Sequence, residues 1–203
     1  MATKRPLGRP PASSRQDVEA VAVELFLARG FEQTTVDDIA AAAGIGRSTF
    51  FRYFPAKADV LWLPFDHHLD RLPATLAERP LAEPLTTAII HGVMQAMRES
   101  GDPRGVWLRR FVAQEEQALQ EHESVRWSRW AAVVADFAAK RLPGARGELA
   151  AAMLGAATQA LIRSMLRRRA GRDTHTETVL DEIERELHAL LGPLQTWLDQ
   201  IGS

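Results

Sequence analysis

Residues 35–57 read TVDDIAAAAGIGRSTFFRYFPAK, a pattern that indicates two short helices joined at a glycine. Thr35 and Asp38 fit the S/T-x-x-D/E pattern of a capping box, which marks the start of a short helix running to Gly44. A glycine there supplies the positive φ angle that a tight turn between two helices needs. A second short helix begins around Gly46 and ends before the proline, because the residue preceding a proline rarely stays helical. Two short helices joined in this way predict a helix-turn-helix.

The apolar residues of this stretch are expected to hold its two helices against a helix that precedes them. These residues are Val36, Ile39, Ala40, Ile45, Phe50 and Phe54. The preceding helix opens at Ser13 or Ser14 as its cap and ends at Gly30. Its own apolar face consists of Val18, Val21, Ala22, Leu25 and Phe26. The three helices together predict a small DNA-binding domain.

The second short helix is predicted to expose a polar, basic face. The face consists of Arg47, Ser48, Thr49, Phe51, Arg52 and Tyr53. Arginine pairs with the O6 and N7 atoms of guanine, and serine or threonine reaches bases or phosphates. Lys57 lies near the start of the next helix, where free amides and the helix dipole favour a phosphate. These residues point to DNA, although any pair of short Ala-rich helices can show a similar pattern.

The motif is longer than a generic helix-turn-helix, and over about residues 14–62 it resembles the TetR family of bacterial transcriptional regulators. The leading run F-x-x-x-G-F/Y-x-x-T-T-V is matched by Phe26, Gly30, Phe31, Thr34, Thr35 and Val36. The run I-A-x-x-A-G-V-S-x-x-T-F/L-Y-x-Y/H-F-x-x-K is matched by Ile39, Ala40, Ala43, Gly44, Ile45, Thr49, Phe50, Tyr53, Phe54 and Lys57.

The resemblance gives each matching position a role on DNA. The implied contacts are a phosphate for Thr35, the major groove for Arg47, Ser48 and Thr49, and the DNA backbone for Phe51, Tyr53 and Lys57. Two positions depart from the family. Gly46 stands where Ser or Thr commonly caps the recognition helix, which weakens the cap by a few tenths of a kcal/mol. Phe51 stands where Tyr is frequent, so a hydroxyl contact to phosphate is lost.

A basic arm precedes the motif. It carries Lys4, Arg5, Arg9 and Arg15, and no acid comes before Asp17. The extended tripeptide Gly8-Arg9-Pro10 suits the minor groove of A·T-rich DNA. The alternative is a flexible tail that touches nothing.

The composition bounds the class of protein. The 203 residues are 46% hydrophobic and contain no cysteine, which excludes a disordered chain, a disulfide framework and a thiol nucleophile. No uninterrupted apolar stretch reaches the ~18 residues of a membrane span, so a cytoplasmic protein is expected. The net charge of −1 argues against a DNA partner when taken alone. Yet residues 1–16 and 43–57 hold seven basic side chains and no carboxylate. The distribution of charge therefore favours a DNA partner, although the net charge does not.

Helical periodicity continues to the end of the chain, so the expected fold class is all-α. The expected parts are a flexible basic arm (1–12), a three-helix DNA-binding domain (13–57) and a larger helical domain (58–203). The resemblance assigns effector binding and dimerisation to the larger domain. Pro64 is expected to kink or restart the helix that begins near Lys57.

Two stripes in the larger domain are candidates for its functions. Helices over 147–169 and 174–191 are expected to pair with a symmetry mate, or else to close the core of one chain. Their candidate interface residues are Met153, Ala157, Leu161, Leu180, Ile183 and Leu187. A ligand pocket, or alternatively plain core, is expected among Phe65, Trp107, Phe111, Trp127, Trp130 and Phe137.

Other polar residues give weaker signals. His67, His68, His91 and His122 lack a metal-ligand spacing such as H-x-x-x-H, so no metal site is expected. The arginines between Arg163 and Arg172 form a basic cluster at the C-terminus of a helix, where the dipole favours cations.

A closer resemblance gives that cluster a second interpretation. Several runs look like the mycofactocin-system branch of TetR regulators, which is associated with long-chain acyl-coenzyme A effectors. The runs are GRPPASSRQDVE (8–19), the stretch 34–62, FDHHLDRL (65–72), ALQEHE (118–123) and RWSRWAAVVADFAAKRL (126–142). On this basis the arginines would bind the phosphates of an acyl-CoA.

The resemblance therefore implies a ligand-responsive regulator, most simply a repressor. It would bind a palindromic operator as a homodimer and leave it when a small apolar effector binds, with no resident cofactor. No G-x-S-x-G, H-E-x-x-H or P-loop motif suggests an enzyme. The alternative is a helical protein-interaction module that retains the helix-turn-helix as scaffold.

Overall fold

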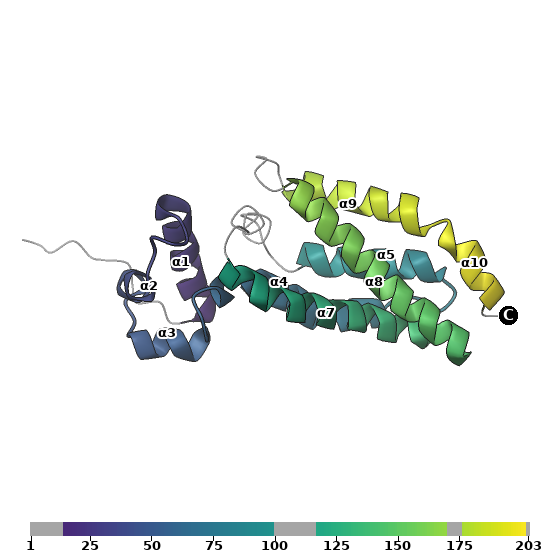
Figure 1. Ribbon diagram of the computed structural model, residues 1–203, viewed down its shortest axis with the longest axis horizontal. Coiled ribbons are helices and arrows are strands. Elements are labelled where there is room, and N and C mark those ends of the chain that lie inside the picture. The colour runs from purple at the N-terminus through teal and green to yellow at the C-terminus, as the bar shows by residue number, and fades with distance from the viewer. Residues whose placement is uncertain (1–13, 100–116, 170–175, 202–203) are drawn as a thin grey trace, which may run out of the picture. The chain divides into compact units, whose positions relative to one another are not determined.

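The computed structural model describes residues 14–99, 117–169 and 176–201 of the chain. Within these ranges it contains nine α-helices and no strand, which confirms the predicted all-α class (Figure 1). The chain divides into two compact units, Met1–Leu63 and Pro64–Ser203.

The first unit contains α1 (Arg15–Arg29), α2 (Val36–Ala43) and α3 (Arg47–Tyr53). The predicted core residues Ile39, Phe50 and Phe54 are completely or almost completely buried. The rings of Phe50 and Phe54 lie 5.4 Å apart, a separation typical of packed aromatic pairs. Because α2 contacts both α1 and α3, the predicted packing of a helix-turn-helix against a preceding helix is confirmed.

Capping boxes fix the first turns of α1 and α2. In α1 the cap is Ser14, and in α2 the Thr35 hydroxyl accepts a hydrogen bond from the Asp38 amide at 3.1 Å. The Asp38 carboxylate accepts in return from the Thr35 amide at 2.9 Å. The Thr35 hydroxyl also donates to the Asp38 carboxylate at 2.6 Å, and this bond, followed by the one from the Thr35 amide, holds the pKa of Asp38 below its ordinary value. Gly44 ends α2 with φ at +70°, the left-handed conformation expected for the turn.

The helix α4 (Asp59–Ala77) contains Pro64 and Pro73 and runs through both. The alternative that Pro64 restarts the helix is therefore wrong. A proline inside a helix costs roughly 3 kcal/mol. The buried side chains of Phe65, Leu69 and Leu72 offset this, because each contributes roughly 1.5–3 kcal/mol on burial.

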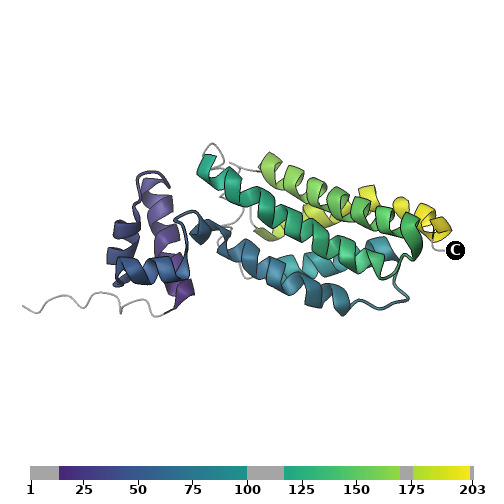
Figure 2. The ribbon, with the colours of Figure 1, turned by 60° about the horizontal axis from the view of Figure 1, so that its bottom comes forward.

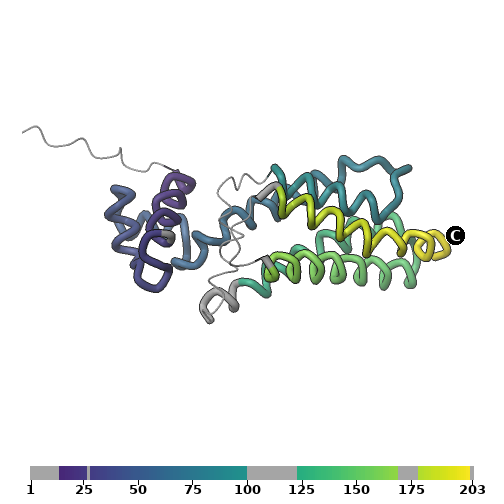
Figure 3. The backbone as a smooth tube through the Cα atoms, turned by 90° about the horizontal axis from the view of Figure 1, so that it is seen from above, coloured from purple at the N-terminus to yellow at the C-terminus, as the bar shows by residue number. Residues whose placement is uncertain are grey.

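The second unit also contains α5 (Leu85–Glu99), α7 (Gln117–Ala139), α8 (Gly144–Arg169), α9 (Thr176–Leu191) and α10 (Leu194–Ile201). Figure 2 shows α7 and α8 side by side along their length. Their approach is close at Gly155, where an added Cβ would collide with the carbonyl oxygen of Ala131. The backbone traces in Figure 3 show α9 lying along α5, with which it is in contact.

The core of the second unit is built around two tryptophans of α7. Trp127 and Trp130 are each about 1% exposed, and their rings lie 5.9 Å apart. An ion pair between Arg126 and Asp66 joins α7 to α4, with hydrogen bonds of 2.7 and 3.1 Å. This ion pair fixes α7 to α4 at the residue that precedes Trp127.

Candidate nucleic-acid interface

The helix α3 presents a polar face to solvent. Arg47, Ser48, Phe51 and Arg52 are exposed, whereas Phe50 between them points into the core. Thr49 and Tyr53 are half-buried. The seven-residue helix therefore exposes the guanidinium and hydroxyl groups that can reach base edges in a major groove.

Arg47 already has an anionic partner. Its Nη1 atom donates to the two carboxylate oxygens of Asp37, at 2.8 and 2.9 Å. The guanidinium also lies 5.4 Å from the centre of the Phe51 ring. Asp37 is on α2, so this pair joins the two helices of the motif on their exposed side.

Lys57 is tied to the protein as well. Its Nζ atom donates to the carbonyl oxygen of Phe31 at 2.8 Å and lies 4.0 Å from the centre of the Phe31 ring. An ammonium has three donors, so this contact leaves two for a phosphate. Thr35, the other predicted phosphate contact, is exposed at the start of α2, where its hydroxyl serves the capping box.

Gly46 occupies the cap position of α3 and makes no side-chain hydrogen bond. Its φ and ψ angles of −80° and 154° are those of an ordinary capping residue, so the backbone does not require glycine here. The weak cap predicted from the sequence is confirmed.

Some predicted site residues lie outside the described part of the chain. These are Lys4, Arg5 and Arg9 of the basic arm, and Trp107 and Phe111 of the aromatic stripe. Their roles stay predictions.

Three of the predicted pocket residues line one cavity in the second unit. Phe65, Trp127 and Trp130 enclose it together with Pro64, His68, Met97 and Ile162, and its volume is about 10 Å³, room for about one water molecule. Phe137 is absent from this lining, and its ring lies 4.6 Å from the guanidinium carbon of Arg141.

Three buried side chains with polar groups, His68, Trp127 and Trp130, line the cavity. The indole nitrogen of Trp130 donates to Nε2 of His68 at 2.7 Å, so the neutral His68 ring carries its proton on Nδ1. Burial lowers the pKa of His68 to about 4, although a backbone contact with Ala96 opposes the shift. The indole nitrogen of Trp127 is buried and has no hydrogen-bond partner among the described residues.

Comparison with known proteins accounts for both units. Residues 20–61 match the bacterial regulatory proteins of the tetR family, and residues 79–192 match the MftR C-terminal domain. The chain is 34% identical over 142 residues to a Mycobacterium tuberculosis (strain ATCC 25618 / H37Rv) protein named as a mycofactocin biosynthesis transcriptional regulator, MftR. That match covers 68% of this chain and 70% of the relative. The chain belongs to the TetR family. The predicted family and its mycofactocin-regulator branch are thereby confirmed.

Other members of the TetR family are similar over parts of the chain or in fold alone. The regulator TcmR of Streptomyces glaucescens is 40% identical over 70 residues, covering 34% of this chain and 31% of that protein. The crystal structure of the repressor AlkX from Dietzia sp. superposes with a TM-score of 0.55 at 16% identity, covering 96% of this chain and 100% of that one. These relatives regulate transcription and are not enzymes, in agreement with the prediction. Dimeric repressors are typical of the TetR family.

The basic cluster of this TetR-family chain is partly neutralised. Arg163 donates to Glu123 at 2.7 Å, and Arg167 lies 3.5 Å from the same carboxylate. The Glu123 side chain is only 2% exposed. Arg163 therefore stabilises a buried acid of α7, which leaves the exposed Arg167 and Arg168 as the better candidates for binding a phosphate.

The predicted interface residues separate into two groups. Leu180, Ile183 and Leu187 on α9 are buried within a single chain, as the alternative of a monomer core requires. Met153 on α8 is 39% exposed, and Ala157 and Leu161 are half-buried. An interface on these helices would therefore use their exposed apolar residues, which are Leu149, Met153 and Leu190.

The apolar character of α8 also has a second interpretation. Residues Gly144–Arg168 are long and apolar enough, by length and composition alone, to cross a membrane. Buried helices of soluble proteins meet the same criterion, and 39% of the apolar window is buried here. Partner helices can cover such a surface in a helix bundle.

The sequence interpretation missed one polar group of the second unit. His91, Glu184 and His188 come together as potential metal ligands. Glu184 and His188 are four residues apart on one helix, a spacing visible in the sequence. Their proximity to His91 on α5 is visible only in the fold.

Proposed function

We propose that this TetR regulator represses transcription in the cytoplasm by binding a palindromic operator as a homodimer. The observation that carries the proposal is the exposed face of α3 with Arg47, Ser48 and Arg52. Such a short helix, fixed by a tight turn to the helix before it, enters the major groove and reads base edges.

Dimerisation gives the regulator two recognition helices. Two half-sites one helical turn apart, about 34–36 Å, match a two-fold protein. The exposed side chains of Leu149 and Met153 on α8 and Leu190 on α9 support pairing through these helices, which contact each other within the chain. Leu149 is 74% exposed, Met153 39% and Leu190 52%. Covering these apolar side chains with a second copy of the chain would stabilise a dimer through the hydrophobic effect.

The effector binds in the cavity beside Trp127 and has an apolar body with one hydrogen-bond acceptor. Phe65, Met97 and Ile162 supply the apolar wall. The buried indole N–H of Trp127 lacks a described partner, and an unsatisfied donor costs about 1–3 kcal/mol. An effector carbonyl would satisfy it.

A long-chain acyl-CoA is the effector that we propose to test. At about 10 Å³ the cavity has room for about one water molecule, far less than the roughly 300–1,000 Å³ of ligand sites. An acyl chain therefore requires the helices to open. The effector then binds the open state of the regulator more tightly than the closed state, and this difference in affinity is what drives release from DNA. The exposed Arg167 and Arg168 follow Ile162 on α8 and are the candidates for the CoA phosphates.

Selection of bound sequences from random DNA by the purified chain tests the operator. The expected result is one enriched palindrome, whereas failure to enrich any sequence favours a protein-interaction module. Palmitoyl-CoA is then titrated into the complex, with free CoA as control. If palmitoyl-CoA releases the protein from DNA and free CoA does not, and if Trp127→Phe weakens this release, the result supports an acyl-CoA effector. If neither compound releases the protein, acyl-CoA is not the effector.

A further inference from the structure

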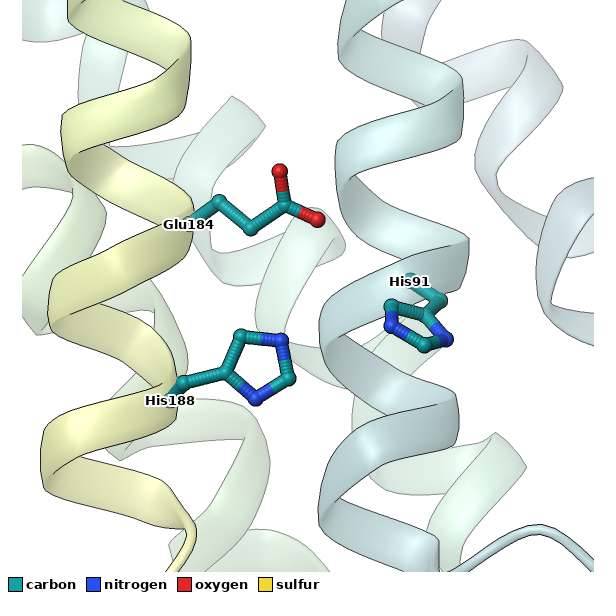
Figure 4. A group of neighbouring side chains, drawn as sticks. All are labelled: His91, Glu184 and His188. Carbon is teal, nitrogen blue, oxygen red and sulfur yellow. The ribbon is translucent and has the colours of Figure 1, made fainter.

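Two helices of the second unit bring together two histidines and a glutamate from distant parts of the sequence. His91 lies on α5, whereas Glu184 and His188 lie one turn apart on α9. One potential ligand atom of each residue lies within 4.8 Å of the other two. Figure 4 shows Glu184 and His188 projecting from α9 toward His91 on the facing helix.

The contacts around His91 prepare its ring for a metal. Nδ1 of His91 lies 2.7 Å from Oε1 of Glu83, so that nitrogen carries the proton and Nε2 remains available. Histidines that ligate metals commonly donate their other nitrogen to a carboxylate in this way. Arg79 fixes Glu83 in turn through two hydrogen bonds of 2.8 Å. The ring is therefore oriented without using the metal-facing nitrogen.

An arginine of α5 holds Glu184 in place. Arg98 donates to its Oε2 atom at 2.6 Å and to Asp181 at 3.2 Å. Ligating carboxylates are usually hydrogen-bonded at one oxygen, which leaves the other for the ion. The side chains of His91 and Glu184 are 39% and 27% exposed, so an ion from solution can reach them. His188 is exposed and can adjust its rotamer.

We propose that His91, Glu184 and His188 bind a divalent transition-metal ion, with Zn²⁺ as the best match, and that the ion clamps α5 to α9. Two imidazoles and one carboxylate, completed by water, form an established zinc donor set. Mg²⁺ and Ca²⁺ prefer oxygen ligands and match it poorly. Zinc bonds of about 2.0–2.2 Å place neighbouring ligand atoms about 3.4 Å apart, so ligand atoms now within 4.8 Å of one another approach by at most about 1.4 Å on binding.

Calorimetric titration of the full, tag-free chain with ZnCl₂ after EDTA treatment and dialysis tests the site. We expect one Zn²⁺ per chain, a melting temperature that rises with Zn²⁺, and no saturable binding of Mg²⁺. His91→Gln and His188→Gln should each weaken binding at least tenfold. His188 is exposed, so its variant keeps the fold, which circular dichroism verifies.

The matched control is His67→Gln, which removes a half-buried histidine outside the group. Its zinc affinity should equal that of the wild type. The proposal is overturned by an absence of saturable zinc binding, by unchanged affinity in both variants of the group, or by an equal loss in His67→Gln.

Discussion

Arg47 on the recognition helix α3 donates through Nη1 to both carboxylate oxygens of Asp37 on α2, at 2.8 and 2.9 Å. The side chain that we assign to base reading is thus engaged by an acid of the same motif. Both side chains are well exposed, at 60% and 68%. Exchange of this partner for a guanine edge therefore costs little, since exposed ion pairs contribute only about 0–1 kcal/mol.

Asp37→Asn should tighten operator binding about two- to fivefold, which corresponds to the free energy of one exposed ion pair. The change frees Arg47 and removes a carboxylate close to the DNA. Fluorescence anisotropy at fixed salt measures the affinity. Glu32→Gln is the matched control, because it removes the same charge from an exposed position of the first unit. An equal gain in operator affinity in Glu32→Gln would mean that net charge alone explains the effect.

Gly46→Ser should stabilise the chain by a few tenths of a kcal/mol, because serine supplies the missing cap of α3. A Cβ at this position has its nearest neighbour, Oγ of Ser48, at 3.8 Å, so the substitution causes no clash. Urea unfolding followed by circular dichroism measures the difference. Gly46→Ala adds the same Cβ without a hydroxyl and should be less stable than the wild type. A gain with alanine would contradict the capping explanation.

The buried histidine predicts a pH dependence. The pKa of His68 is lowered by burial from 6.5 to about 4, so between these values the unfolded chain takes up a proton that the folded chain does not. The free energy of unfolding should fall by up to about 3 kcal/mol as the pH drops from 6.5 to 4. His68→Gln should flatten this part of the profile while keeping an acceptor for Trp130. An unchanged slope would show that His68 titrates normally.

Arg163→Met should destabilise the chain by about 2–3 kcal/mol, because it removes from the buried Glu123 carboxylate the cation that lies 2.7 Å from it. Thermal and urea unfolding measure the loss. Arg168→Met, at an exposed neighbouring position, should change stability by less than about 0.5 kcal/mol. Similar values for the two variants would mean that the Glu123 pair contributes nothing.

The features predicted well from the sequence are those encoded within one turn or one motif. Thr35 and Asp38 form the expected capping box, and Gly44 has the expected positive φ, because each depends on neighbours a few residues away. Pro64 shows the limit of such local rules. The burial of side chains such as Phe65 outweighs the helix-breaking tendency of the proline, and the sequence alone does not show that balance.

Contacts between residues far apart in the sequence could not be predicted from hydrophobic periodicity. An apolar stripe marks Ile183 as buried but does not say whether its own chain or a partner covers it; the structure buries it within the chain. The basic cluster near Arg163 gave no sign that a buried acid on α7 neutralises it. His91 and His188 likewise meet only because α5 packs against α9.

Arg47→Ala is the variant that decides whether α3 reads DNA through Arg47. Lys57 is less suitable, since its contact with Phe31 makes it structural as well. Fluorescence anisotropy on the selected operator, with helix content checked by circular dichroism, is the measurement. Arg129→Ala is the control for charge, at an exposed position of the second unit. Arg47→Ala should bind the operator about ten- to a hundredfold more weakly than the wild type, and the control should bind it with unchanged affinity. Wild-type affinity in a folded Arg47→Ala chain would show that α3 does not read DNA through this arginine.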